Sequence, residues 1–223
     1  MDYLNYGKEN QNIVFDTFDV RVHKEPFPHL IIENFYDDKE LELIWEELKF
    51  YTKPGKLLEA KDYGGVVDST NAKALILDQI YLNQESRGGL NYRNISNILT
   101  TNRKIFNSGV LDTYSQIHEC CVKNCNADVT KIRYYHDGEY YEPHTDSGFQ
   151  TLAFSYFYRE PKAFSRGELY FPRYTYELPC TNNSMIIFPG WVEHGVNKIK
   201  IKNSDYYDGL GRYVITQFLH SRI

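Results

Sequence analysis

Hydrophobic residues in the first half of the chain predict a strand followed by amphipathic helices. The stretch "FPHLIIENFY" at 27–36 is a mainly apolar run typical of a buried strand. The segment "DDKELELIWEELKFY" comes next and predicts a helix, for which Asp37 or Asp38 is a suitable N-cap. Further helical patterns cover 95–106 and 111–121. The apolar residues that share one face of the first helix are Leu41, Ile44, Trp45 and Leu48.

Beyond residue 128 the pattern changes to short segments rich in β-branched and aromatic residues. These segments are "VTKIRYYH", "QTLAFSYFY", "GELYFPRYTYEL", "SMIIFPG", "GVNKIKIK" and "GRYVITQFLH". They predict an antiparallel sandwich or open barrel over 129–223, with the strands and helices of 1–128 buttressing one face. The expected fold class is therefore α+β with a mainly β core, built as a single domain.

Two shorter segments, 56–70 and 198–202, are interpreted individually. Residues 56–70 contain Gly64 and Gly65 and show little periodicity, so we expect a loop there; loops next to a site often act as lids, and the sequence leaves open whether this one does. In "KIKIK" at 198–202, lysines alternate with isoleucines, which predicts a strand with one solvated face.

Length and charge limit the classes of protein that the sequence can represent. A chain of 223 residues suits one substantial domain, which buries roughly 70% of its unfolded surface. The formal net charge of -5 argues against a protein built to hold nucleic acid, since such proteins need clustered Lys and Arg. Aromatic residues make up 16% of the chain, which suits either a wet aromatic-lined cleft or ordinary sheet packing.

Targeting signals and cysteines lead to expectations about location. No apolar run reaches the roughly 20 residues of a membrane-spanning helix, and "MDYLNYGKENQN" lacks a basic start and a hydrophobic segment. The four cysteines, Cys120, Cys121, Cys125 and Cys180, match neither a paired zinc framework nor a small secreted scaffold. We therefore expect reduced thiols in a soluble, cytoplasmic protein without a membrane partner.

The stretch "YYEPHTDS" at 140–147 is the first candidate for chemistry, because His144 and Asp146 lie two positions apart. On or beside a strand, such residues point to the same side and can reach one ion. By itself the motif is weak, since chance supplies roughly 0.4 occurrences in this composition. A third ligand would come from a neighbouring strand, and His194 in "MIIFPGWVEHGV" is the candidate. Two imidazoles and one carboxylate favour non-haem Fe(II), while Zn(II) accepts the same donors.

An arginine opens the last predicted strand, "GRYVITQFLH". Strand alternation places four of its residues on one face: Arg212, Val214, Thr216 and Phe218. A guanidinium on the inner face of a barrel requires an anionic partner, and a carboxylate of a bound ligand would satisfy it in bidentate fashion. An exposed arginine at a strand end is the alternative.

Taken together, these motifs resemble the Fe(II)- and 2-oxoglutarate-dependent dioxygenases, specifically the prolyl 4-hydroxylase-like branch. The resemblance rests on "YYHDGEYYEPHTD", "TLAFSYFY", "GELYFP", "MIIFPGWVEHGV" and "GRYVITQFL", and it spans about residues 129–220. The earlier segment "PFPHLIIENFYDDKE", which is followed by a predicted helix, also looks like the usual beginning of the family's domain. The positions that match the branch's pattern are Tyr135, Gly138, Tyr141, His144, Asp146, Gly167, Phe171, Pro172, His194, Val196 and Arg212.

The resemblance implies a double-stranded β-helix, or jelly-roll, and a catalytic set of four residues. It implies that His144, Asp146 and His194 hold Fe(II), and that Arg212 pairs with the distal carboxylate of 2-oxoglutarate. The implied cosubstrates are 2-oxoglutarate and O2, and ascorbate is allowed as an additional reductant.

Other residues are expected around the cosubstrate. By the same resemblance, Tyr135 hydrogen-bonds 2-oxoglutarate and Thr216 lies near the iron. Phe188 and Trp191 are expected either to enclose the site or to pack as core aromatics. A further polar partner is expected from "TLAFSYFY", and its register leaves three candidates open: Thr151, Ser155 and Tyr156.

Two departures from the family pattern are present. Arg212 lies farther from His194 than the family's usual spacing, so we interpret "NSDYYDGL" as an insertion that lengthens a hairpin. Lys200 and Lys202 lie nearer to His194 but lack the "RYVIT" context. Arg166 replaces the first glycine of the family's Gly-Gly pair, which we expect to alter the substrate entrance rather than the metal site.

The implied reaction is hydroxylation of an unactivated C–H bond, with release of succinate and CO2. A peptidyl proline is the first choice of substrate, because the most similar motifs are those of prolyl hydroxylases. A free amino acid, another peptidyl residue or a small metabolite stays open, and so does a zinc-bound or non-catalytic barrel that acts as a binding module. The excess of acidic over basic residues argues against a nucleic-acid substrate.

Overall fold

The computed structural model describes most of the chain. The predicted loop, 56–70, is described at 56–59 and 62 alone, so the question whether it is a lid lies outside the described residues. Helices in the described part are too short or too polar to span a bilayer. The described residues are 11–14, 18–59, 62, 72–81, 92–118, 121–146, 148–202 and 204–221.

Strands dominate the described structure. Those of the first half are β1 (Gln11–Val14), β2 (Asp19–His23), β3 (His29–Glu33) and β4 (Lys73–Ile76). Those of the second half are β5 (Ala127–Tyr135), β6 (Tyr141–His144), β7 (Thr151–Phe157), β8 (Phe164–Ser165), β9 (Leu169–Phe171), β10 (Tyr176–Leu178), β11 (Ser184–Pro189), β12 (His194–Val196), β13 (Lys200–Ile201) and β14 (Arg212–His220).

Helices occupy the segments between the first strands. The predicted helix after Asp37 is confirmed, and Asp37 is its N-cap in a reciprocal capping box with Glu40. The two later helical patterns resolve into several short helices. The helices are α1 (Asp38–Tyr51), α3 (Leu77–Tyr81), α4 (Asn97–Thr101), α5 (Lys104–Asn107) and α6 (Val110–Tyr114), with 3-10 turns η2 (Tyr92–Ile95), η3 (Cys121–Asn124), η4 (Pro172–Tyr174) and η5 (Tyr206–Asp208).

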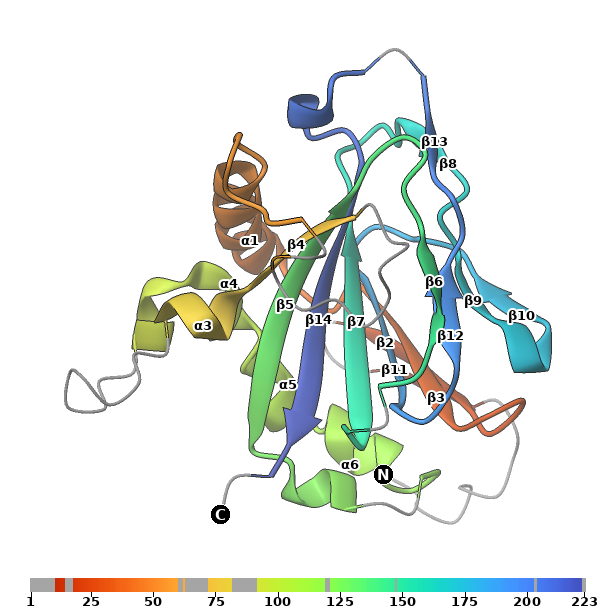
Figure 1. Cartoon of the computed structure of the whole chain (residues 1–223). Coiled ribbons are helices and arrows are strands. Elements are labelled where there is room, and N and C mark those ends of the chain that lie inside the picture. The colour runs from red at the N-terminus through yellow and green to blue at the C-terminus, as the bar shows by residue number, and fades with distance from the viewer. Residues whose placement is uncertain are drawn as a thin grey trace.

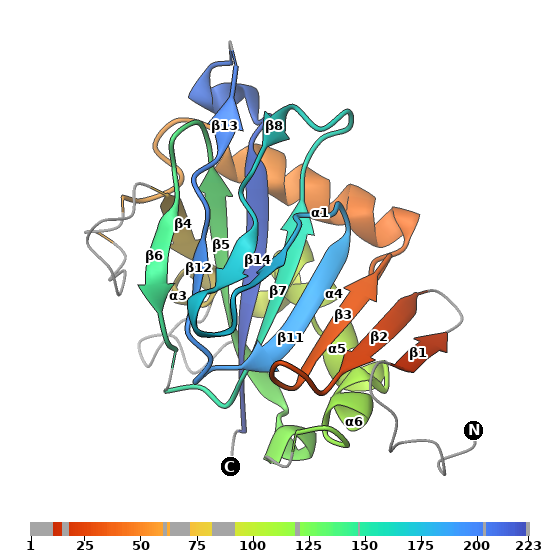
Figure 2. The ribbon, with the colours of Figure 1, turned by 90° about the vertical axis from the view of Figure 1, so that its right-hand side faces the viewer.

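Two antiparallel sheets face each other. The larger has the strand order β1-β2-β3-β11-β7-β14-β5-β4, the smaller has the order β10-β9-β12-β6, and β8 pairs with β13. In Figure 1 the helices lie on one side of the larger sheet, while β6, β9 and β12 lie on the other. Figure 2 shows the smaller sheet in front and α1 behind. This is the predicted α+β architecture with a mainly β core.

Strand β14 contributes to two apolar cores. Tyr213 and Ile215 pack in the cluster that contains the helices, whereas Val214 and Phe218 pack in the cluster between the sheets. Side chains of a strand alternate between its faces, so residues with the parity of Val214 point toward the smaller sheet. The predicted shared face of Arg212, Val214, Thr216 and Phe218 is therefore confirmed, and it is the inner face of the two-sheet structure.

The lysine-rich segment 198–202 has the predicted solvated face. Ile199 and Ile201 are buried, while the lysines that alternate with them are exposed. This exposure removes Lys200 and Lys202 as inner-face alternatives to Arg212. The chain between β13 and β14 contains η5, so an elongated connection does precede Arg212.

A buried acid, Glu139, lies in the turn between β5 and β6. Its side chain accepts a hydrogen bond from the backbone N–H of His136 at 2.6 Å, and its carbonyl accepts one from Ile199 N–H at 3.0 Å. Burial raises the pKa of Glu139 to about 7, although the His136 N–H and the Lys73 charge oppose this.

The raised pKa predicts a pH-dependent contribution to stability. Between about pH 4.5 and 7 the folded protein keeps a proton on Glu139 that the unfolded chain releases, so stability falls as the pH rises. Because Glu139→Gln removes this loss, the free energy of unfolding of the variant should exceed that of the unchanged protein by about 3 kcal/mol at neutral to alkaline pH. Urea unfolding on both sides of this window measures the difference, and an equal difference on both sides would contradict the assignment.

Candidate metal centre and active site

The two histidines of the predicted triad face each other across the smaller sheet. His144 ends β6, and antiparallel pairing with β12 places His194 directly opposite. Their ring centroids are 4.5 Å apart. The apolar strand β11 leads the chain through the turn at Gly190 into β12, and His194 is buried there. Strand pairing therefore brings together two residues that are 50 positions apart.

Asp146 follows β6 in a turn that depends on the glycine at position 190. The Asp146 N–H donates to the Gly190 carbonyl at 2.9 Å, and the Phe149 N–H donates to the Asp146 carbonyl at 2.9 Å. A Cβ atom on residue 190 would lie 2.1 Å from the carbonyl oxygen of Phe149 and 2.7 Å from that of Asp146. The close approach of two backbone segments therefore positions the carboxylate.

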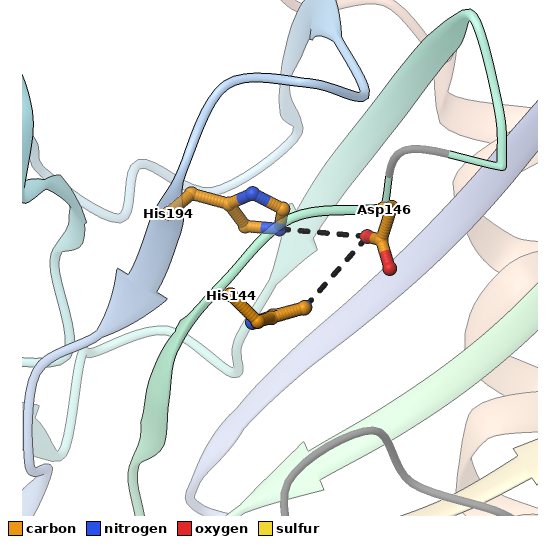
Figure 3. A group of neighbouring side chains, drawn as sticks. All are labelled: His144, Asp146 and His194. Carbon is orange, nitrogen blue, oxygen red and sulfur yellow. Dashed lines mark ion pairs between the residues drawn. The ribbon is translucent and has the colours of Figure 1, made fainter.

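The three side chains converge on one point, as Figure 3 shows. Nε2 of His144 lies 3.7 Å from Oδ2 of Asp146, and Nε2 of His194 lies 3.6 Å from the same oxygen. The ligand atoms of the three residues all lie within 4.8 Å of one another. Two nitrogens and one oxygen at this spacing are donors that Fe(II) and Zn(II) both accept.

Hydrogen bonds to carbonyls orient both imidazoles for metal binding. Nδ1 of His144 lies 3.0 Å from the Glu142 carbonyl, and Nδ1 of His194 lies 2.9 Å from the Val192 carbonyl. A carbonyl can only accept, so each Nδ1 carries the proton and each Nε2 presents a lone pair. Nε2 of His194 is buried without a hydrogen-bond partner among the described residues. This orphaned acceptor, beside a carboxylate, shows that the set fits a divalent metal.

Burial and charge keep the triad in the protonation states that metal binding requires. Burial lowers the pKa of His194 to about 4, with a contribution from neighbouring His144, so the imidazole is neutral near pH 7. Burial alone would raise the pKa of Asp146, but the His144 and His194 imidazoles outweigh it, with help from Arg133, and the pKa lies below its ordinary value. The aspartate is therefore a carboxylate.

Arg212 is fully buried on the inner face without an acidic partner among the described residues. Its exposed fraction is 0%, and its three guanidinium nitrogens have no hydrogen-bond partner in the described part of the chain. The guanidinium carbon lies 4.7 Å from the ring centre of Tyr156 and 5.2 Å from that of Tyr135. Ring faces attract a cation but do not neutralise it. A bound carboxylate would satisfy these donors, so the site fits 2-oxoglutarate.

Tyr135 and Thr216 lie toward opposite ends of the inner face. Tyr135 pairs with Arg212 across the ladder between β5 and β14. Thr216 pairs with Phe154 of β7, and the Phe154 ring lies edge-on to His194 with centroids 5.3 Å apart. The structure therefore places Tyr135 at the arginine and Thr216 beside a residue that packs against the metal site.

The structure distinguishes the three residues of β7 that were candidates for a polar contact with 2-oxoglutarate. Tyr156 faces Arg212, and its hydroxyl is buried without a partner among the described residues. Ser155 pairs with Ile215, whose side chain packs in the cluster with the helices, and Thr151 has the same parity as Ser155. Tyr156 is therefore the member of this strand that can reach a ligand of Arg212.

The two aromatic residues expected at the site differ in their surroundings. The Phe188 ring is buried and lies edge-on to His194, with centroids 5.0 Å apart. Trp191 is 50% exposed, so the expectation that it packs as a core aromatic is wrong. It directly follows Gly190, in the connection between β11 and β12.

Two cations on the inner face, Lys131 and Arg133, are absent from the sequence-based predictions. Their spacing from Tyr135 is the available signal, because residues i, i-2 and i-4 of a strand share one side. The Arg133 guanidinium carbon lies 3.9 Å from the Tyr141 ring centre, and Nη2 donates to the Tyr141 hydroxyl at 3.1 Å. The Tyr141 ring lies against His144, with centroids 4.6 Å apart, so one aromatic ring separates Arg133 from the triad.

Comparison with solved structures identifies the fold. A prolyl 4-hydroxylase from Pseudomonas putida has a TM-score of 0.53 at 12% identity, covering 87% of this chain and 92% of that one. A prolyl hydroxylase from Trichoplax adhaerens has a TM-score of 0.56 at 13% identity, covering 86% and 83%. A 2OG-Fe(II) oxygenase family protein from Burkholderia pseudomallei has a TM-score of 0.56 at 12% identity, covering 86% and 84%.

Sequence comparison adds no closer relationship, since no family model and no curated protein matches the chain. At identities of 12 to 13%, the structural similarity shows the fold, and the activity must be argued from the site. The fold is the double-stranded β-helix found in prolyl hydroxylases and related 2-oxoglutarate oxygenases, as the motif resemblance implies.

The tight turn at Gly190 predicts a loss of metal affinity when its space is filled. Gly190→Ala must displace the carbonyls of Phe149 or Asp146, so the carboxylate moves and Fe(II) affinity should fall by about tenfold or more. Gly148→Ala is the matched control in the same turn, because a Cβ there meets nothing within 4 Å. Anaerobic Fe(II) titration compares the two variants, and equal affinities would contradict the role given to Gly190.

Proposed function

We propose that the protein is an Fe(II)- and 2-oxoglutarate-dependent dioxygenase that hydroxylates an unactivated C–H bond. The observation that carries this proposal is the orphaned guanidinium of Arg212, on the inner face that also borders His144, Asp146 and His194. A metal-binding module would need the triad but would have no use for a fully buried arginine that has no counter-ion among the described residues. A cosubstrate that carries a free carboxylate accounts for both features.

The part of each residue follows from its position. His144, Asp146 and His194 would hold the metal ion, which would let O2 oxidise 2-oxoglutarate to succinate and CO2 and hydroxylate the C–H bond, one oxygen atom going to each product. Arg212 would hold the distal carboxylate through paired hydrogen bonds. The Tyr156 hydroxyl, buried beside it, would donate to the same carboxylate.

Aromatic rings around the triad would keep water away from it. Phe154 and Phe188 both lie edge-on to His194, and Tyr141 lies against His144. A dry environment strengthens the electrostatic interactions on which ligand binding depends.

For the substrate we propose a peptidyl proline. The motifs of the second half of the chain support it, since they are most similar to those of prolyl hydroxylases. The similar structure from Trichoplax adhaerens was solved in complex with a hypoxia inducible factor peptide fragment, which supports a peptide in the corresponding position here. A free amino acid or another small molecule is the alternative within the same chemistry. We propose a cytoplasmic location, which the buried free thiol of Cys180 supports.

Anaerobic reconstitution tests the reaction class. Fe(II) and 2-oxoglutarate added together without O2 should produce a metal-to-ligand charge-transfer band, because the cosubstrate would bind at the metal. Admission of O2 should then give succinate, even from uncoupled turnover. A protein that binds Fe(II) yet shows neither the band nor succinate is not a dioxygenase of this class. Tight Zn(II) binding without any response to 2-oxoglutarate would favour the binding module instead.

Replacement of the buried arginine separates the cosubstrate site from the metal site. Arg212→Ala should weaken 2-oxoglutarate binding by about 10- to 100-fold, the loss expected for a charge-assisted bidentate pair, while Fe(II) affinity stays near that of the unchanged protein. Lys200→Ala, on the exposed face of β13, is the control and should alter neither affinity. Loss of Fe(II) binding in a folded Arg212→Ala protein would show that the role assigned to this residue is wrong.

A further inference from the structure

A partly exposed tryptophan lies in the segment that anchors two of the three triad residues. Trp191 is 50% exposed and lies between Gly190 and Val192 in the connection from β11 to β12. The Gly190 carbonyl accepts a hydrogen bond from the Asp146 N–H at 2.9 Å, and the Val192 carbonyl accepts one from Nδ1 of His194 at 2.9 Å. Both sequence neighbours of Trp191 therefore hold residues of the triad, so its backbone lies beside the proposed metal site.

Hydrogen bonds also hold the backbone of Trp191 in a defined conformation. The Val192 N–H donates to the Pro189 carbonyl at 3.1 Å, which closes a turn with Gly190 and Trp191 at its centre. The Gly190 N–H donates to the Gln150 carbonyl at 3.3 Å. Val192 is 1% exposed, so the turn directs this side chain inward and leaves the indole outward. The indole is thus carried by a turn that is attached on both sides.

A second aromatic side chain comes from the segment that is hydrogen-bonded to this turn. Phe149 lies three residues after Asp146, and its N–H donates to the Asp146 carbonyl at 2.9 Å. The Phe149 ring is partly buried and lies 4.8 Å from the ring of Phe218, which belongs to the inner face of β14. The two segments that meet at Asp146 therefore each carry a partly exposed aromatic side chain, Phe149 on one and Trp191 on the other.

The position of Trp191 distinguishes it from the other exposed apolar side chains. Single exposed apolar residues are common on protein surfaces, so exposure alone has no meaning. Helices α1 and α3, which carry three of these residues, lie across the larger sheet from β12 (Figure 1). Trp191 is the member of the group whose neighbours hold the triad. The large hydrophobic residues that are exposed in the described part of the chain are Leu43, Phe50, Leu58, Ile80, Ile95, Trp191 and Tyr207.

Interactions within the chain do not explain why position 191 is a tryptophan. No described side chain stacks on its indole or accepts a hydrogen bond from its N–H. The other tryptophan, Trp45, instead packs edge-on against Phe157 and Tyr213, with ring centroids 6.5 and 5.5 Å apart. A large aromatic side chain that is held in place and left uncovered is typical of the anchor residues of binding surfaces.

We propose that Trp191 binds the substrate by receiving the ring of the proline to be hydroxylated against its indole. This inference rests on the proposed function and names a substrate-binding residue of the same site. A flat aromatic surface suits a saturated ring, because the contact buries apolar surface and requires no buried charge. Covering the exposed half of an indole removes roughly 100 Å² from water, so deletion of the contact should weaken binding about tenfold or more.

Fluorescence tests the contact directly, because the chain contains two tryptophans. Trp45→Phe leaves Trp191 as the single tryptophan emitter. This variant, loaded with Fe(II) and 2-oxoglutarate without O2, is titrated with a pool of end-capped pentapeptides that carry a central proline. The neutral quencher acrylamide then measures the accessibility of Trp191. Saturation with the pool should reduce the quenching constant by about half or more, since the proline ring would cover the indole.

Variants measure how much the contact contributes to binding. Trp191→Ala should weaken binding of the proline pool about tenfold, whereas Trp191→Phe keeps an aromatic ring and should stay within about threefold of the unchanged protein. Phe50→Ala is the matched control, because Phe50 is an aromatic residue of similar exposure, 45%, on α1, and it should not alter the affinity. Calorimetry without O2 measures the affinities, and circular dichroism establishes that each variant is folded.

A double-mutant cycle assigns the contact to the proline itself. The same pool with a central alanine should bind the unchanged protein about tenfold more weakly than the proline pool. Because the contact between the indole and the proline ring can be lost only once, this loss and that of Trp191→Ala should not add. In Trp191→Ala the two pools should therefore bind with affinities within about threefold of each other.

Several results would overturn the proposal. They are an unchanged quenching constant at saturating peptide, additive losses in the cycle, an equal loss in Phe50→Ala, and binding of no peptide. If Trp191→Ala does not fold, the quenching result from Trp45→Phe decides. The charge-transfer band, recorded on the same samples, separates this inference from the proposed function. If the band is absent, the proposed function fails, whereas a normal band with an accessible indole in the peptide complex contradicts this inference alone.

Discussion

The burial of β14 on both faces is the constraint on which the rest of the structure depends. From Arg212 to Leu219 the strand has no exposed residue, and it pairs with β5 on one side and β7 on the other. A shift of one residue in either ladder would turn every side chain to the opposite face and would drive the guanidinium into the apolar cluster with the helices. The pairing that builds the core therefore also determines where the charged end of the strand lies.

The triad depends on a different structural feature, which is the close approach of two chain segments at one end of the smaller sheet. The histidines lie opposite each other on paired strands, so their separation is a property of the ladder. The carboxylate lies outside the ladder, in a turn held by backbone hydrogen bonds to Gly190 and within Asp146–Phe149. Strand pairing supplies two ligands and a tight turn supplies the third, which is why Gly190, although not a ligand, is predicted to affect metal binding.

The features that the sequence predicted well are those with a periodic or chemical signature. The pair His144 and Asp146, the histidine after an apolar strand, and the parity of Arg212 all follow from alternation and donor chemistry. The choice between Ser155 and Tyr156 could not be made from the sequence. Strand β7 is buried on both faces, so "TLAFSYF" shows no polar alternation, and its register becomes visible only in its pairing with β14.

Strand β6 lies at one end of the smaller sheet, with β12 as its sheet neighbour. A strand paired along one side is among the first parts of a sheet to open, because half of its backbone groups contribute nothing to its attachment. An ion held by His144 and His194 would join β6 to β12 as a cross-link, and Asp146 would extend that link into the following turn. Metal affinity in this protein would then include the free energy of ordering a sheet edge, so changes in the attachment of β6 would alter metal retention without touching a ligand.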